Sequence, residues 1–158
     1  MSRDRLIYEV SKYFDIRELV GEKTYSRHGN RSWKFLDPYL LSCILVVREG
    51  IGKPMTANTW HKGGRFSQRG LRTGVQQIVK SYFKRGQLYL SAHLFGRALD
   101  FTVQGMTATE VRQWCVDNSM LFPCKIRLEK TYKGKEISWV HLDTFWEEQN
   151  PQVYLFAA

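Results

Sequence analysis

The stretch SAHLFGRALDF, residues 91–101, contains a histidine and an aspartate, two residue types that bind metal ions, and it ends in mostly apolar residues. Its second half predicts a strand over residues 98–103. Because side chains alternate along a strand, Asp100 would face a cleft while its two apolar neighbours anchor the strand in the core. Gly96 would permit a sharp turn that brings His93 back over the same face. The stretch therefore predicts a loop and a strand that offer one imidazole nitrogen and one carboxylate oxygen to a single ion.

A second stretch, SWVHLDT at residues 138–144, provides a third candidate ligand. His141 stands in an alternating apolar run that predicts a strand. Two histidines and one carboxylate leave a fourth tetrahedral position for water, which is how a catalytic zinc ion is held. Such an ion polarises a carbonyl and lowers the pKa of its bound water to about 7. Each histidine taken singly is more typical of a hydrogen-bonded structural residue. If His93, Asp100 and His141 meet around one ion, the mechanism would be metal-assisted hydrolysis.

The chain is basic, since its 158 residues carry 24 lysines and arginines against 15 acids, a net charge of +9. This balance favours polyanionic partners such as nucleic acid, anionic membrane surfaces or acidic cell-wall polymers. Basic residues are concentrated at residues 69–87. A solubilising surface would explain the same excess. Charge alone therefore indicates a class of partners without choosing among them.

Cysteine usage and hydropathy indicate where the chain is made. Cys43, Cys115 and Cys124 lack the spacing of a metal finger, and their odd number argues against a disulfide framework. The longest apolar run, residues 39–47, is too short to span a bilayer. The N-terminus, MSRDRLIYEV, lacks the apolar region of a secretory signal. We therefore expect synthesis in the cytoplasm, buried free thiols and no membrane span.

Periodicity and capping residues predict the helices and strands. Asp37 and Pro38 begin a strongly apolar helix that reaches about residue 50, and the capping box TATE at residues 107–110 begins another. The remaining expected elements are an amphipathic helix over 3–14, a polar loop over 25–35, a basic loop over 61–74, a helix over 75–83, and a hairpin of strands over 125–130 and 136–142.

The order of these elements favours an α+β fold with a small, mainly antiparallel sheet flanked by helices, because helices and strands are segregated rather than alternating. The length favours a single domain over residues 1–158. Within it, an N-terminal helix and loop over residues 1–34 would precede a metal-binding core over residues 35–145.

Together the two stretches resemble the motifs of a known enzyme family. SAHLFGRALD matches all five fixed positions of the motif SxHxxGxAxD, and WVHLD resembles the second motif, a strand that supplies the last ligand. These motifs are typical of the zinc D-alanyl-D-alanine carboxypeptidases and the phage L-alanyl-D-glutamate endopeptidases. The wider fold group includes lysostaphin-type peptidases and the hedgehog signalling domain. The resemblance covers roughly residues 35–145 and implies a hedgehog/DD-peptidase-like fold.

The resemblance also implies roles for individual residues. The family's ligands correspond to His93, Asp100 and His141, which would hold one Zn²⁺ ion. The serine of the first motif corresponds to Ser91, beside the metal on the substrate side.

An arginine of the family's substrate site has no direct counterpart. Family members usually carry it in an SGYRS-like turn upstream of the first motif, and Trp60 stands about where it would be. Arg65, Arg69 and Arg72 are candidate replacements, and Arg72 is favoured because it follows a Gly-Leu turn. The alternative is that these arginines only solvate the loop or face an anionic polymer.

The general base is also altered. Many family members place Asp or Glu three residues before the last histidine, where this chain has Ser138, and serine cannot act as a base at neutral pH. Asp143 shares a strand face with His141, whereas Glu136 points away unless a bulge intervenes. Asp143 would alternatively orient neighbouring groups, and Glu129 across the hairpin is a further candidate. The sequence does not decide which of Asp143, Glu136 and Glu129 would act as the general base.

The resemblance implies a zinc-dependent peptidase that hydrolyses peptidoglycan stem peptides, as a phage endolysin or a virion-associated lytic enzyme. It would act in the cell-wall space after release, or be carried in the virion beside other virion proteins. Ser138 and the altered arginine turn keep open a second reading, a structural or cell-wall-binding virion protein with the peptidase fold and little or no catalysis. A third reading, a nucleic-acid-binding module, has only positive charge and aromatic residues in its favour.

Overall fold

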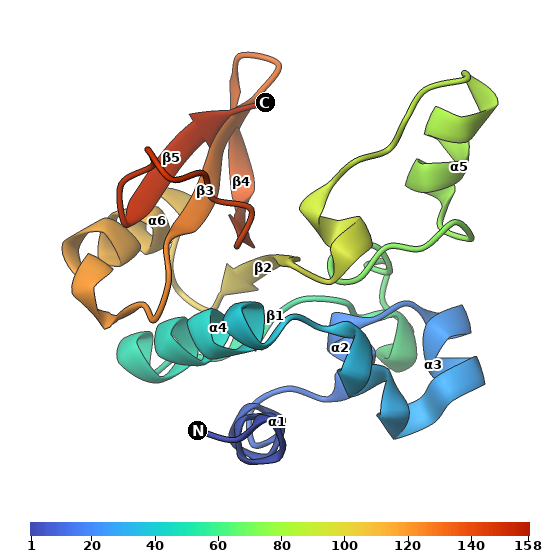
Figure 1. Cartoon of the computed structure of the whole chain (residues 1–158), viewed down its shortest axis with the longest axis horizontal. Helices are drawn as coiled ribbons and strands as arrows, with labels where there is room; N and C mark the ends of the chain where they lie inside the picture. The colour runs from blue at the N-terminus through green and yellow to red at the C-terminus, as the bar shows by residue number, and fades with distance from the viewer.

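A computed structural model describes residues 1–158 as helices packed around one five-stranded sheet (Figure 1). The helices are α1 (Arg3–Ser11), α2 (Ile16–Leu19), α3 (Glu22–His28), α4 (Pro38–Ile51), α5 (Gln77–Lys84) and α6 (Ala108–Asp117). Short 3₁₀ helices are η1 (Gly29–Phe35), η2 (Trp60–Lys62), η3 (Ala92–Phe95) and η4 (Ser119–Leu121). The strands are β1 (Met55–Thr56), β2 (Ala98–Val103), β3 (Ile126–Tyr132), β4 (Lys135–Asp143) and β5 (Val153–Ala157). None of the helices has the length and apolarity needed to cross a membrane.

The sheet has the strand order β1-β2-β4-β3-β5. All neighbouring pairs are antiparallel except β3 and β5, which are parallel. The predicted α+β class with a mainly antiparallel sheet is therefore confirmed. The turn between β3 and β4 holds Lys133 and Gly134 at positive φ, 49° and 75°, as two-residue hairpin turns require.

One hydrophobic core joins α1, α4 and the sheet. As predicted, Asp37 caps α4, accepting a hydrogen bond from the backbone N–H of Tyr39 at 2.6 Å, and Pro38 occupies the first turn. In Figure 1, α4 lies between the sheet and α1. Leu6 and Val10 of α1 belong to the same cluster of 27 buried residues as α4 and the sheet. Residues 1–34 and 35–145 therefore pack as one unit.

Two segments differ from the sequence predictions. Residues 25–35, expected as a polar loop, are helical in α3 and η1. The Arg3 guanidinium donates to the carbonyls of Trp33 and Leu36 at 3.1 and 2.8 Å, so contacts from α1 support this segment. The helix expected at 75–83 is confirmed as α5, and none of its residues is buried. Strand β5 has no counterpart among the expected elements, although its Val, Tyr, Leu and Phe residues follow Asn150 and Pro151 as a strand signal would. It adds to the edge of β3 in parallel.

Candidate metal centre

Three buried side chains converge where η3, β2 and β4 meet. His93 Nε2 lies 3.3 Å from both His141 Nδ1 and Asp100 Oδ1, and the latter two atoms are 2.7 Å apart. Ligands that are each about 2.0–2.1 Å from a tetrahedral zinc ion are about 3.3 Å from one another. The group could therefore hold a metal ion after small adjustments of the side chains.

Hydrogen bonds behind the histidines direct one nitrogen of each ring toward the site. His93 Nδ1 lies 2.8 Å from the carbonyl oxygen of Gly70, which can only accept, so Nδ1 carries a proton and Nε2 has its lone pair free. His141 Nε2 donates to Asp143 Oδ2 at 3.0 Å, which leaves Nδ1 for an ion. Outer partners of this kind fix the tautomer and the ring orientation of histidine ligands. The donor set thus fits a metal ion in orientation as well as in distance.

The backbone explains why residues far apart in sequence meet here. Asp100 of β2 and His141 of β4 are register partners, and residues directly opposite in antiparallel strands point to the same face. His93 reaches that face because η3 ends in a turn at Gly96, whose φ is 66°. A Cβ at Gly96 would come within 2.1 Å of the Phe35 carbonyl oxygen. Only glycine fits this turn without strain.

Burial and pairing set the charges of the three residues. Burial lowers the pKa of His93, and nearby Asp100 only partly opposes it. Burial would raise the pKa of Asp100, but the two histidines outweigh it and hold that pKa below its ordinary value. Burial would likewise lower the pKa of His141, but hydrogen bonds to Asp100 and Asp143 raise it to about 10. Without a metal ion, a proton on His141 Nδ1 therefore joins it to Asp100, and metal binding has to displace that proton.

Asp143 lies behind His141 rather than in front of it. Its carboxylate accepts from His141 Nε2 and from Arg127 Nε and Nη2, the latter at 2.8 and 3.0 Å. Burial would raise the pKa of Asp143, but these hydrogen bonds lower it. The side chain is only 1% exposed. Asp143 is thus placed to orient a ligand, not to contact a substrate.

Glu136 and Ser138 of β4 both lie on the side of the sheet that faces α6. Glu136 accepts from Arg112 at 2.8 Å and from Thr109, although the β3–β4 ladder does contain a register shift beside it. Ser138 borders a small cavity beneath α6, together with Val140. Neither residue lines the space in front of the metal centre.

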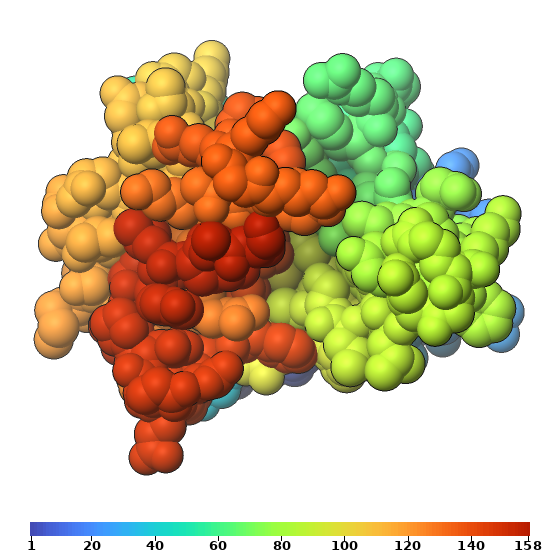
Figure 2. Space-filling view, turned by 90° about the horizontal axis from the view of Figure 1, so that it is seen from above, coloured from blue at the N-terminus to red at the C-terminus, as the bar shows by residue number.

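A cleft of about 350 Å³ opens in front of the metal centre. Figure 2 shows the hollow between the lobe of α5, in green-yellow, and the orange and red lobe of β3, β4 and β5. The side facing α5 is lined by Ile78, Tyr82 and Tyr89, and the side facing the sheet by Glu129, Tyr132 and Trp139. The cleft places aromatic rings on both sides of the candidate ligands.

Of the four residues predicted to bind substrate, two line the cleft and two do not. Ser91 and Arg72 line the cleft. Ser91 Oγ also accepts from the backbone N–H of His93 at 3.4 Å, which caps η3. Trp60 and Arg69 do not line the cleft. The indole of Trp60 donates to the Val20 carbonyl at 3.0 Å, which ties it to the body of the protein instead.

Arg72 forms a hydrogen bond with Asp100, one of the candidate ligands. One guanidinium nitrogen donates to Asp100 Oδ2 at 2.9 Å, another to the hydroxyl of Tyr89 at 2.7 Å, and Nε to the Gln68 carbonyl at 2.6 Å. Oδ2 of Asp100 thus accepts from Arg72, while Oδ1 faces the two histidines and could bind an ion. Arg72 is a positioning residue at the border of the cleft.

Glu129 is the cleft carboxylate that is not part of the ligand set. It is the register partner of His141 across the hairpin, so both side chains project from the same face of the sheet. Burial raises its pKa, and the charge of His141 partly opposes this. Arg127, which holds Asp143, lies two residues earlier on the same strand. The alternation of β3 is the sequence signal that places both residues on the side of the metal centre.

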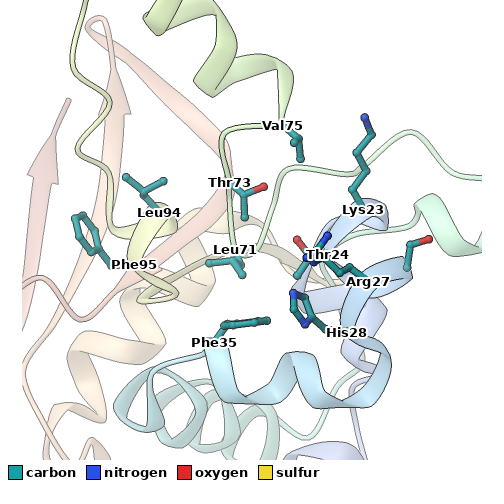
Figure 3. A pocket seen from close by; sticks show the side chains of 11 residues that line it. Lys23, Thr24, Arg27, His28, Phe35, Leu71, Thr73, Val75, Leu94 and Phe95 are labelled. Carbon is teal, nitrogen blue, oxygen red and sulfur yellow. The ribbon is translucent and has the colours of Figure 1, made fainter.

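A larger cavity of about 760 Å³ is lined by Leu71, Thr73 and Leu94, the sequence neighbours of Arg72 and His93 (Figure 3). In Figure 3, side chains of α3, among them Arg27 and His28, face an apolar wall that includes Phe35 and Leu94. No carboxylate or cysteine lines this cavity. His28 is its single imidazole, so the group that could hold a metal ion belongs to the smaller cleft.

Comparisons of the chain with models of protein families, with curated proteins and with solved structures gave no match. The likeness to zinc peptidases rests on the two sequence motifs. The geometry of the three candidate ligands is independent of that likeness.

Proposed function

We propose that this chain is a zinc-dependent peptidase that hydrolyses peptidoglycan stem peptides, with a hedgehog/DD-peptidase-like fold. The observation that carries the proposal is the convergence of His93, Asp100 and His141, each oriented from behind by its own hydrogen-bond partner. The sequence motifs supply the substrate class. The net charge of +9 suits work on an anionic wall, as a phage endolysin or a virion-associated lytic enzyme.

Zinc is the proposed ion because two imidazole nitrogens and one carboxylate oxygen, with one side open to a cleft, are a usual catalytic zinc set. When bound, zinc polarises a scissile carbonyl and lowers the pKa of water to about 7. Arg72 and Asp143 keep Asp100 and His141 in position. The aromatic residues of the cleft provide surfaces along which a peptide can lie.

Glu129 is the proposed general base. It takes a proton from the attacking water as the water oxygen bonds to the carbonyl carbon, and it delivers that proton to the leaving amine as the C–N bond breaks. Its place in the cleft, on the same face as His141, supports this role. A carboxylate on the neighbouring strand would thus serve in place of the family residue that Ser138 replaces.

Zinc-loaded protein incubated with purified peptidoglycan is expected to release new amino termini. Glu129→Gln should keep stoichiometric zinc and lose about 10²–10⁴-fold in rate, whereas His93→Ala should lose both zinc and activity. Glu136→Gln, on the far side of β4, is the matched control and should keep both. Zinc-loaded wild-type protein that leaves peptidoglycan intact would contradict the peptidase proposal, and an active Glu129→Gln variant would contradict the assigned base.

A second candidate, a wall-binding or structural virion protein that keeps the peptidase fold, is favoured by one observation. The position of the family base is Ser138, which lies outside the cleft. Protein that sediments with cell walls and binds zinc, but releases no amino termini, would select this reading.

A further inference from the structure

The segment around α5 forms an arm, residues 75–90, that projects from the body (Figure 1). Figure 2 shows it as a separate lobe across the cleft from the sheet. No residue of α5 is buried. Tyr82 and Tyr89 pack ring edge to face at 5.2 Å and tie the two sides of the arm together. The arm is thus an ordered projection rather than a part of the core.

The tip of this arm, residues 83–88, exposes large apolar side chains. Phe83 is 83% exposed, Leu88 is 82% exposed, and nearby Leu90 is 70% exposed. Contact of large apolar side chains with water is unfavourable. A group of such side chains on a protein surface therefore often marks an interaction site. The grouping at one projecting tip points to a partner that can receive apolar groups.

All the charged side chains of the arm are basic. The longer segment from residue 50 to residue 99 contains nine lysines and arginines and no acid. Lys80, Lys84 and Arg85 belong to the arm, and none of them forms an ion pair. Arg85 instead lies over the ring of Tyr82 at 4.8 Å. An anionic partner therefore meets no competing carboxylate on this arm.

We propose that the tip of the arm docks on an anionic lipid surface, with Phe83 and Leu88 entering the headgroup region and Lys80, Lys84 and Arg85 contacting lipid phosphates. Apolar groups beside unpaired cations suit a membrane interface, where both kinds of surface are present within a short depth. A polyanion such as nucleic acid or a wall polymer would use the cations and leave the apolar tip in water. A second copy of the arm would bring like charges together. This inference does not depend on peptidase activity.

The test is sedimentation of the purified full chain with vesicles of phosphatidylglycerol mixed into phosphatidylcholine, compared with pure phosphatidylcholine. Wild-type protein should bind the anionic vesicles, and added salt should weaken the binding. The double variant Phe83→Ser/Leu88→Ser should bind at least about tenfold more weakly, because two apolar side chains no longer leave water. Lys84→Glu should weaken binding about tenfold through its two-unit change of charge.

Met120→Ser is the matched control. Met120 is 90% exposed, but no lysine or arginine lies between residues 113 and 124, so its vesicle binding should equal that of wild type. All these sites are exposed, and thermal melts should confirm that each variant is folded. No binding to anionic vesicles would overturn the proposal. So would full binding by Phe83→Ser/Leu88→Ser, which would show an association through charge alone, or equal weakening by Met120→Ser.

Discussion

At the scale of single residues, the centre is a balanced arrangement of charge. Asp100 and Asp143 flank His141, and each carboxylate also has its own arginine, Arg72 or Arg127. These charged side chains can be buried because each of them has a partner of opposite charge, whereas an unpaired buried charge is strongly destabilising. The same pairing keeps the donors in place before an ion arrives, which reduces the conformational cost of binding it.

Asp143→Asn tests the orienting role of Asp143. The amide keeps the shape of the side chain but loses the charge that draws the proton of His141 to Nε2, so metal affinity should fall about 10–100-fold. Titration of metal-free protein with zinc against a competing chelator measures the change. Glu136→Gln, on the same strand but paired with α6, should leave the affinity unaltered. Equal affinities for Asp143→Asn and wild type would show that the pairing does not tune the ligand.

The convergence of His93, Asp100 and His141 could be predicted from sequence, whereas the contacts of the surrounding side chains could not. The order of His93, Gly96 and Asp100 already implies a turn that brings two donors together. Asp143 is two residues from His141 and Glu129 is opposite it across the hairpin. Only the structure shows that Glu129 lines the cleft and that Asp143 lies behind the ring. Strand register depends on the whole sheet rather than on local pattern.

At the scale of elements, short α2 supports the centre from outside. Its N-cap is Asp15, which forms a capping box with Glu18. The carbonyl of Leu19 in α2 accepts from the backbone N–H of Leu71 at 2.9 Å. The neighbouring Gly70 leaves no room for a side chain, because a Cβ there would lie 2.0 Å from the Leu19 carbonyl oxygen. The carbonyl that holds His93 is therefore positioned by this contact.

Asp15→Ala should lower the free energy of unfolding by about 1 kcal/mol at neutral pH, as loss of a helix cap does. The hydrogen bond from Arg17 lowers the pKa of Asp15 from 3.8 to about 2. A lowered pKa stabilises the folded state above the unfolded value and loses that contribution as pH falls toward the folded value. The difference between wild type and variant should thus be full above pH 5 and shrink below pH 4, both approximate limits from these pKa values.

Denaturant unfolding at a series of pH values measures this difference. Asp15→Asn keeps a capping oxygen without a titrating group, so its stability relative to Asp15→Ala should not vary over the same range. A constant difference between wild type and Asp15→Ala down to the lowest pH would contradict the pairing with Arg17.

Elements with a strong local signal were predictable, and elements that depend on distant partners were not. The cap at Asp37 and the alternation in the hairpin each agree with the tertiary structure. Residues 25–35 are polar and become helical where α1 contacts their carbonyls. The composition of β5 is typical of a strand, but its parallel pairing with β3 depends on the tertiary structure.

At the scale of the whole molecule, a bound ion would join segments that lie 48 residues apart, at His93 and His141. A ligand that binds only the folded state stabilises it by mass action, about 4 kcal/mol at a thousandfold excess over Kd. Zinc added to metal-free protein should therefore raise Tm by on the order of 10 °C. Differential scanning calorimetry measures the shift.

His93→Ala should remove most of this rise in Tm, whereas His28→Ala, at the separate large cavity, should keep it. The thiols of Cys43 and Cys124 lie 3.6 Å apart and are the natural competing zinc donors. A shift that survives His93→Ala but disappears in Cys124→Ser would place the ion at the thiols and contradict the assigned centre.

One guanidinium group connects the metal centre to the arm, because Arg72 donates both to Asp100 and to the hydroxyl of Tyr89. Any tilt of the arm on a bilayer would shift Tyr89 and change the pull on that carboxylate. If the candidate centre holds an ion, its affinity for that ion would then differ between free and lipid-bound protein, because Arg72 contacts both Tyr89 and Asp100.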